Sequence, residues 1–353
     1  MLRIRALPAR HGDCVWIDYG DADNPRRLLI DGGTTGTYEV LKAHLRRLPP
    51  DRRRFDLLIV THVDSDHIGG ALKLLKDDSL GVEFADVWFN GFRHLPGSAV
   101  EEFGPVQGER LTTRLLKTRR WNLAFDGKAV MTSPAGLPSH TLPDGLTLTL
   151  LSPDATKLQP LRSVWDIACR KAGLDPSLPE PAPPPPGIEA FGAPPLPDVE
   201  SLAAVAFKED AAVANGSSIA VLLEFENRRV ILSADAHPTL LRESIERIVG
   251  KGKRLSLDLF KLPHHGSRAN VCRELLESLD VHRYLVSTNG DHFSHPDPEA
   301  MARVIKFGGT TPTLIVNYRS SQTAIWDNTK LRERFKYDVV FPSGEDDGVF
   351  VDL

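Results

Sequence analysis

The chain has 353 residues, of which 41% are hydrophobic and 25% are charged, so it can bury a large core without disulfide bonds. Its 43 basic and 47 acidic residues give a formal net charge of −4, which excludes a global attraction to nucleic acid or to an anionic membrane. The three cysteines are too few and too scattered for a secreted disulfide framework, and no segment approaches the roughly 20 apolar residues of a membrane helix. We therefore expect a globular, cytoplasmic protein with no membrane partner.

The first third of the chain alternates between two kinds of pattern. Runs rich in β-branched and aromatic residues predict strands, and the first three of these runs predict an antiparallel meander. Apolar residues at helical spacing predict helices between the later strands. The expected strands are residues 2–7, 14–20, 26–33, 55–60 and 84–91, and the expected helices are 38–48 and 71–76. Strands that alternate with helices predict a single layered α/β unit.

The middle of the chain concentrates proline. Residues 153–212 lose strand character, with a short helix expected around 161–172, and prolines are densest at 179–198. Because proline interrupts helices and sheet interiors, this stretch is not expected in the core. We expect one domain over residues 1–353, with 153–212 as a proline-rich insertion. The segment 179–198 is either a solvated loop or a docking site for a protein partner.

The middle also contains an expected helix and an expected strand, and the last third of the chain repeats the strand-and-helix pattern of the first. Two apolar runs separated by Glu226-Asn227 predict a hairpin. The expected helices are 108–118, 238–249, 271–279 and 298–307, and the expected strands are 146–152, 218–225, 228–235, 255–263, 284–289, 313–318, 323–327, 338–341 and 348–353.

The sharpest functional signal follows the strand at 55–60. The sequence from His62 to Gly70 reads HVDSDHIGG and places histidine or aspartate at four closely spaced positions. In an extended segment His62 and Asp64 point to the same side, and a tight turn can bring Asp66 and His67 to the same centre. We interpret the segment as a metal-binding motif, against the alternative of a solvated acidic turn.

This motif resembles the HxHxDH signature of the metallo-β-lactamase fold hydrolases. Other segments are similar, in order and approximate spacing, to the nuclease domain of the competence protein ComEC. These segments are HGDCVWID at 11–18, LLIDGG at 28–33, ILSAD at 231–235, LFKLPHHGS at 259–267 and STNGDHFSHP at 287–296. The resemblance implies a four-layer αββα sandwich. It also implies a phosphodiesterase or nuclease that uses a metal-bound hydroxide on DNA or RNA.

The resemblance also implies the metal ligands. His62, Asp66 and His67 match ligand positions of the family, and Asp235 matches the aspartate that bridges two metal ions. The last ligand is expected in the pair His264-His265. Adjacent side chains usually point to different sides, so we expect one ligand, with His264 slightly preferred.

One departure from the family pattern changes the expected metal. The second histidine of the signature is Asp64 here, and a further carboxylate makes the predicted ligand set harder, so that Mn²⁺ competes with Zn²⁺. One or two ions per chain remain open. For catalysis the ligand set leaves Asp66 or Asp235 to orient the hydroxide and accept its proton, and we take Asp66 as the catalytic residue. His265 and His295 are implied to stabilise charge or to protonate the leaving oxygen.

Other functions are compatible with the same residues. The substrate can instead be a small phosphodiester, a thioester or a lactam, which the absence of a strongly basic composition favours. In a third reading Asp64 weakens the metal site and the chain is a non-catalytic binding module. His11 precedes Gly12-Asp13 in the first turn, and it either faces the site or bonds to the turn backbone. The oligomeric state stays undetermined.

Overall fold

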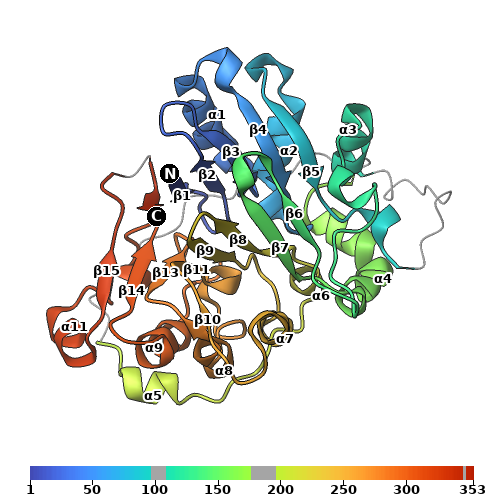
Figure 1. Ribbon diagram of the computed structural model, residues 1–353. Helices are drawn as coiled ribbons and strands as arrows, with labels where there is room; N and C mark the ends of the chain where they lie inside the picture. Colours follow the sequence, from blue (N-terminus) through green and yellow to red (C-terminus); the bar gives the residue numbers. More distant parts are fainter. Residues whose placement is uncertain (97–108, 176–195, 345–346) are drawn as a thin grey trace.

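The computed structural model describes residues 1–96, 109–175, 196–344 and 347–353. Two large β-sheets face each other, and helices cover the outer face of each (Figure 1). The four layers agree with the predicted αββα sandwich. Within the described residues, every helix is too short or too polar to cross a membrane.

The first sheet contains the amino-terminal strands and the last strand of the chain. Its order is β16-β1-β2-β3-β4-β5. The strands are β1 (Leu2–Ala6), β2 (Val15–Tyr19), β3 (Arg26–Ile30), β4 (Arg54–Ile59), β5 (Glu83–Trp88) and β16 (Val349–Asp352). The first three strands pair antiparallel, as the predicted meander requires. β3, β4 and β5 pair in parallel, because α1 (Tyr38–Arg47) and α2 (Ser65–Lys76) form the crossovers between them.

The second sheet has the order β15-β14-β13-β11-β9-β8-β7-β6. Its strands are β6 (Ser139–Thr141), β7 (Thr147–Ser152), β8 (Ala220–Phe225), β9 (Arg228–Leu232), β11 (Leu259–Lys261), β13 (Arg283–Val286), β14 (Thr313–Val316) and β15 (Asp338–Val340). β8 and β9 form the predicted hairpin, with Glu226 in a left-handed turn conformation (φ 53°). β10 (Leu255–Ser256) and β12 (Leu279–Asp280) form a separate short parallel pair.

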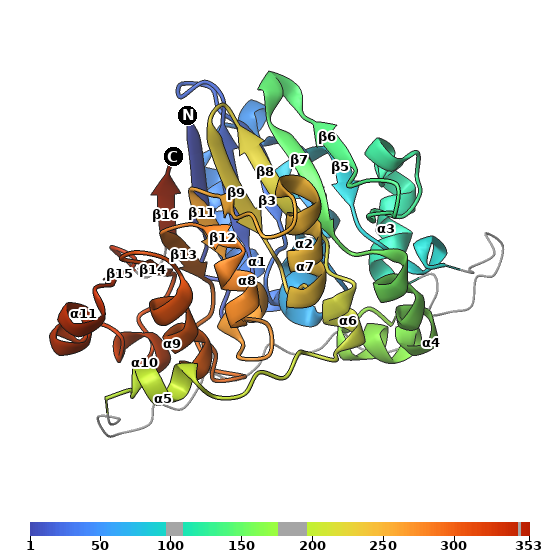
Figure 2. The same cartoon turned by 60° about the horizontal axis from the view of Figure 1, so that its bottom comes forward.

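The buried side chains fall into three apolar clusters that match the layers. Successive residues of a strand point to opposite faces, so Leu28 faces the other sheet while Leu29 faces the helices. The middle cluster lies between the two sheets. The other two fill the spaces under α1 and α2 and under α7 (Pro238–Val249), α8 (Arg273–Glu277) and α9 (Pro298–Phe307). Figures 1 and 2 show these last three helices on the outer side of the second sheet.

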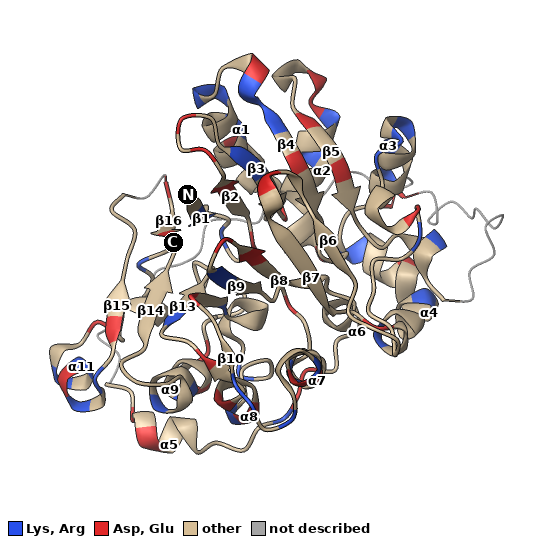
Figure 3. Cartoon of the chain, viewed as in Figure 1, with Lys and Arg blue, Asp and Glu red and all other residues tan. Residues whose placement is uncertain are grey.

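Six further α-helices lie in the described residues. They are α3 (Arg110–Thr118), α4 (Ala155–Lys171), α5 (Val199–Ala203), α6 (Val213–Gly216), α10 (Ser321–Ala324) and α11 (Thr329–Phe335). Basic and acidic residues are interspersed over the elements in view, so no basic stripe stands out on them (Figure 3).

Three sequence predictions differ from the structure. α2 begins at Ser65 and not at residue 71, and α4 begins at Ala155, several residues before the helix expected at 161–172. The strand expected at 323–327 is wrong, because α10 ends there and Ser320 and Thr323 bond to each other's backbone in a capping box.

The proposed insertion is described only in part. Its described residues form helices and loops without a strand, as expected, whereas residues 179–195 of the predicted docking segment lie outside the described residues. The one-domain prediction stays a prediction.

Candidate metal centre

The HVDSDHIGG motif spans the end of a strand and the start of a helix. His62 follows β4, Asp64 precedes the first residue of α2, and Asp66 and His67 lie in the first helical turn. The two glycines that follow let this helix pack directly on the loop after β3. A Cβ atom at Gly70 would lie 2.0 Å from the Gly32 carbonyl oxygen. The close packing of the two backbones therefore fixes where the motif side chains point.

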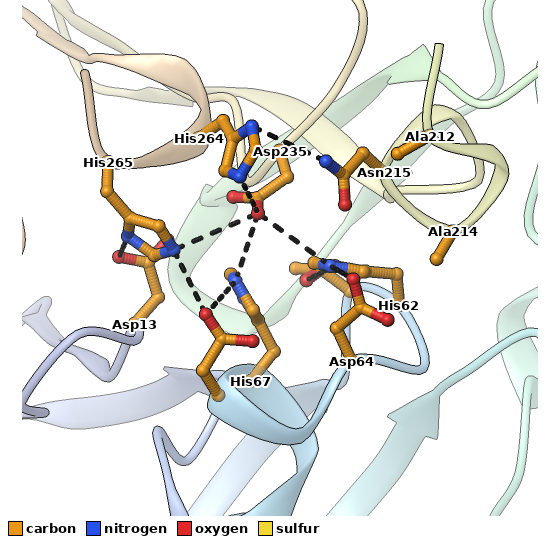
Figure 4. Close-up of polar contacts among 12 residues, drawn as sticks. Asp13, His62, Asp64, His67, Ala212, Ala214, Asn215, Asp235, His264 and His265 are labelled. Atoms are coloured by element: carbon orange, nitrogen blue, oxygen red, sulfur yellow. Dashed lines mark hydrogen bonds and ion pairs between the residues drawn. The ribbon is translucent and has the colours of Figure 1, made fainter. Parts of the chain in front are cut away.

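Four imidazoles surround one buried carboxylate, that of Asp235 (Figure 4). Oδ2 of Asp235 lies 3.3 Å from Nε2 of His67 and 3.8 Å from Nε2 of each of the other three rings, which belong to His62, His264 and His265. Asp235 follows β9 of the second sheet, whereas the HVDSDHIGG motif follows β4 of the first. The carboxylate therefore lies where the two halves of the sandwich meet.

Two other predicted carboxylates border the same group. Oδ2 of Asp66 lies 3.4 Å from Nε2 of His265 and 3.9 Å from Nε2 of His67. Oδ2 of Asp64 lies 3.6 Å from Nε2 of His62, and 37% of the Asp64 side chain is exposed. The structure thus brings all six predicted metal ligands together, with Asp64 at the solvent edge.

The second nitrogen of each ring is held by an acceptor outside the group. Nδ1 of His67 donates to a carboxylate oxygen of Asp31 (2.8 Å), and Nδ1 of His265 donates to the Ser287 carbonyl (2.9 Å). Nδ1 of His264 donates to the side-chain oxygen of Asn270 (2.9 Å). Since none of these oxygens carries a hydrogen, the proton of each neutral ring is on Nδ1.

The same conclusion holds for His62 through one more step. The hydroxyl of Thr61 donates to Asp31 (2.7 Å), so its oxygen can only accept from Nδ1 of His62 (3.0 Å). Nε2 of the neutral ring then carries a lone pair directed at the group. Metal-binding histidines in proteins are oriented in this way by an acceptor on the far nitrogen.

The inward atoms lack hydrogen-bond partners. Among the described residues, the buried Nε2 atoms of His62, His67 and His265 and Oδ1 of Asp235 bond to no other group. Buried polar atoms without partners cost free energy. A group of them therefore usually marks the binding site of an ion or an ordered water molecule. The donor set and its orientation therefore fit a divalent cation.

The electrostatics of the group also fit a bound cation. Burial lowers the pKa of His265, but Asp235 and Asp13 outweigh it and raise the pKa to about 10. Burial raises the pKa of Asp235, but His67, His265 and His264 outweigh it and hold the pKa well below its usual range. The carboxylates thus stabilise positive charge between the rings. That charge is carried either by protons on the Nε2 atoms or by metal ions that replace those protons.

Sequence reasoning missed two aspartates that support this group. Asp31 binds Nδ1 of His67 and the Thr61 backbone and hydroxyl at once. Asp13 lies in a buried set with His67, Asp235 and His265 whose ligand atoms are all within 4.8 Å of one another. Both aspartates belong to the segments that carry the family resemblance, so those segments held the signal.

Asp13 is itself neutralised by a buried lysine. Its Oδ2 lies 2.5 Å from Nζ of Lys261, which is 2% exposed, and its Oδ1 lies 3.4 Å from Nδ1 of His265. Burial raises the pKa of Asp13, but the charges of Lys261 and His265 outweigh it and lower the pKa overall. Asp13 therefore remains ionised beside His265 and helps to orient that ring.

His264 and His265 both face Asp235, although adjacent side chains usually point apart. Both residues adopt left-handed backbone angles (φ 48° and 55°) within a short 3₁₀ turn at Pro263–Gly266. Such angles are uncommon outside glycine and reorient successive side chains. The choice between the two as metal ligand stays a prediction.

His295 lies beside the group and outside its centre. Its ring centroid is 5.2 Å from that of His264, and its Nδ1 lies 3.5 Å from a carboxylate oxygen of Asp297. The side chain is 11% exposed. His295 is thus close enough to reach a molecule bound over His264.

Comparison with known proteins agrees with this architecture. Residues 7–83 match the model of the metallo-beta-lactamase superfamily, a span that runs from the end of β1 to the start of β5 and includes the motif. No curated protein matches the chain. The family model and the two packed sheets confirm the predicted fold class, a metallo-β-lactamase type of α/β sandwich.

Several solved structures resemble the chain at low identity. One is the metallo-beta-lactamase fold protein YhfI from Bacillus subtilis (TM-score 0.44, 10% identity, 100% of both chains covered). Another is CmlA, a diiron beta-hydroxylase from Streptomyces venezuelae (TM-score 0.41, 13% identity, 100% of this chain and 54% of that one). A long form of RNase Z from yeast has a TM-score of 0.37 and 10% identity, over 90% of this chain and 36% of that one.

Proposed function

We propose that this protein is a metal-dependent phosphodiesterase of the ComEC-like type that cleaves DNA or RNA. The observation that carries the proposal is the orientation of the four imidazoles. Each has its Nδ1 proton held outside the group, so its Nε2 is directed at Asp235. The motif resemblance supplies the substrate class, because the ordered segments are most similar to a nuclease domain.

The donors divide into two sets that share Asp235. Asp66, His67 and His265 form one set, and His62, Asp64 and His264 form the other, in which Asp64 and His264 are the more exposed side chains (37% and 22%). This division assigns His265 to the ligands, in addition to the predicted His264. Two ions of Zn²⁺ or Mn²⁺ per chain would use every donor. Bound divalent ions would lower the pKa of water and polarise a phosphoryl oxygen.

One of these donors and one neighbouring side chain are proposed to act in catalysis. Asp66 presents a carboxylate at the group, 12% exposed, where it can orient a water molecule and hold its proton. Nδ1 of His295 lies 3.5 Å from a carboxylate oxygen of Asp297, and we propose that Nε2 of the same ring donates a proton to the leaving oxygen. The proposal thus assigns a base, Asp66, and an acid, His295, that both border the donor group.

A smaller phosphodiester is the second candidate. The interspersed charges of the elements in Figure 3 favour it, since long nucleic acids usually require several basic contacts. A salt titration of cleavage separates the two, because a substrate held by several phosphates loses affinity steeply with salt whereas a small one does not.

The proposal is tested by metal content and by cleavage. We expect purified protein to bind Zn²⁺ or Mn²⁺, and to cleave single- or double-stranded nucleic acid only when metal is present. Asp66→Ala and His67→Ala should each lower kcat/KM by at least about a hundredfold, because each removes a donor that faces the reacting group. His282→Ala is the matched control, since that ring is exposed and bonds to the Thr310 carbonyl.

Two outcomes reject parts of this assignment. Cleavage that persists in both variants would show that a contaminant or another site is responsible. Failure to bind either metal would leave the binding-module reading in its place.

A further inference from the structure

Three aromatic rings gather at one side of the metal centre. Phe293 lies 4.3 Å from His292 and 6.1 Å from His11, measured between ring centroids, and the two imidazoles are 4.9 Å apart. We call His11, His292 and Phe293 the aromatic platform. Its two histidine positions come from opposite ends of the sequence, so the fold itself assembles it.

Both ends of the platform connect to residues of the donor group. The Phe293 ring lies 6.0 Å from that of His295, which lies 5.2 Å from that of His264. On the other side, His11 precedes Gly12, and the backbone N–H of Asp13 donates to the Asp66 carbonyl (3.2 Å). A molecule held over His264 and Asp66 would therefore have the platform within reach.

Phe293 is an exposed apolar side chain in a polar loop. Fifty-two per cent of its surface is accessible, and Asp291, His292 and Ser294 beside it are also exposed. The other large apolar residues that the structure shows to be exposed belong to other segments of the chain. An isolated ring in a polar loop offers too little apolar area to hold a lipid chain or a membrane.

A flat group with polar edges suits this surface better. Phenylalanine has a π face, while the two imidazoles add π faces and hydrogen-bonding edges. Nucleobases have the same combination, and stacking on aromatic rings is the usual way in which proteins hold them without reading sequence.

We propose that the aromatic platform binds the base next to the scissile phosphodiester, by stacking on Phe293. This inference rests on the proposed function and narrows its substrate to nucleotides. Phe293 is then a specificity-determining residue and has no part in bond cleavage. The expected consequence is a preference for phosphodiesters that carry a base over those that do not.

Two substrates with the same leaving group test the inference. Thymidine 5′-(p-nitrophenyl phosphate) carries a base, and methyl p-nitrophenyl phosphate does not. With metal-loaded protein, Phe293→Ala should raise KM for the first by about tenfold, with kcat and the second substrate changed by less than twofold. Tenfold corresponds to 1.4 kcal/mol, within the range of one stacked base. Phe293→Tyr should retain most of the affinity for the first substrate. Phe350→Ala, which removes another exposed phenylalanine ring, should leave KM for both substrates unchanged.

Calorimetry of thymidine 5′-monophosphate binding gives a readout that does not need turnover. We expect wild-type protein to bind it more tightly than ribose 5-phosphate, and Phe293→Ala to remove most of that difference. Equal losses on both substrates, or equal binding of both phosphates by wild-type protein, would overturn the platform. Absence of all phosphodiester cleavage together with base-dependent binding would overturn the proposed function and leave the platform standing.

Discussion

The tautomers of the four histidines are set by acceptors outside the proposed ligand set. Asp31 is the clearest case, because one carboxylate accepts from His67, from the Thr61 hydroxyl and from the Thr61 backbone. Through that hydroxyl it also decides the proton position on His62. A single buried side chain thus orients two of the proposed ligands, and its replacement would disturb both.

The buried pair of Lys261 and Asp13 leads to a stability prediction. Lys261→Met leaves the Asp13 carboxylate buried without its cation, so we expect a loss of about 3–5 kcal/mol in the free energy of unfolding. Urea unfolding of the metal-free protein measures it. Asp13→Asn combined with Lys261→Met should recover part of the loss, because neither charge is then buried alone.

An exposed pair provides the comparison for that experiment. Arg273 and Glu277 are 59% and 47% exposed, so Arg273→Ala should change the free energy of unfolding by no more than about 1 kcal/mol. A loss of that small size in Lys261→Met would mean that the buried pair adds nothing beyond a surface contact.

At the scale of elements, the sequence predicted those whose apolar pattern is regular. The hairpin of β8 and β9 and helices α7 and α9 lie where their periodicity placed them. The apolar pattern places the start of α2 too late, because the first turn of this helix consists of polar residues of the motif. The strand expected at 323–327 failed because Ser320 and Thr323 cap a helix there, and local capping outweighed the β-branched composition.

The contacts of the site were less predictable than its motif. The spacing from His62 to His67 is local, so it could be read directly. The pairing of Asp13 with His265 joins two segments at opposite ends of the chain, and only the packing of the two sheets brings them together. The left-handed angles of His264 and His265 are likewise a product of the surrounding structure.

The start of α2 leads to a prediction about glycine. In an exposed helix Gly→Ala usually stabilises by up to about 1 kcal/mol. Gly70→Ala should do the opposite and cost about 2–3 kcal/mol, because its Cβ would lie 2.0 Å from the Gly32 carbonyl oxygen. Gly136→Ala, with no atom within 4 Å of its Cβ, should stay within about 0.5 kcal/mol. Denaturant unfolding of both variants decides, and a stabilised Gly70→Ala would show that the helix does not pack as closely as described.

At the scale of the whole molecule, the proposed ligands divide between the two halves of the sandwich. The motif from His62 to His67 follows the first sheet, whereas Asp235 and the pair His264-His265 follow strands of the second. The apolar layer between the sheets holds the halves together away from the site. At the site itself, unpaired nitrogens and carboxylates from both halves face each other. A bound cation would therefore act as a link between the sheets.

This arrangement predicts that metal removal weakens the whole fold. An ion that binds only the folded chain stabilises it by about 2.7 kcal/mol when its free concentration is a hundred times its Kd. We expect dialysis against a chelator to lower Tm by several degrees, and Zn²⁺ or Mn²⁺ to restore it in a concentration-dependent way. Mg²⁺ at the same concentration should restore little, because four imidazole donors suit it poorly. His67→Ala should abolish most of the metal-dependent shift while His282→Ala keeps it. If Tm changed neither on treatment with the chelator nor on addition of metal, no cation would link the two sheets.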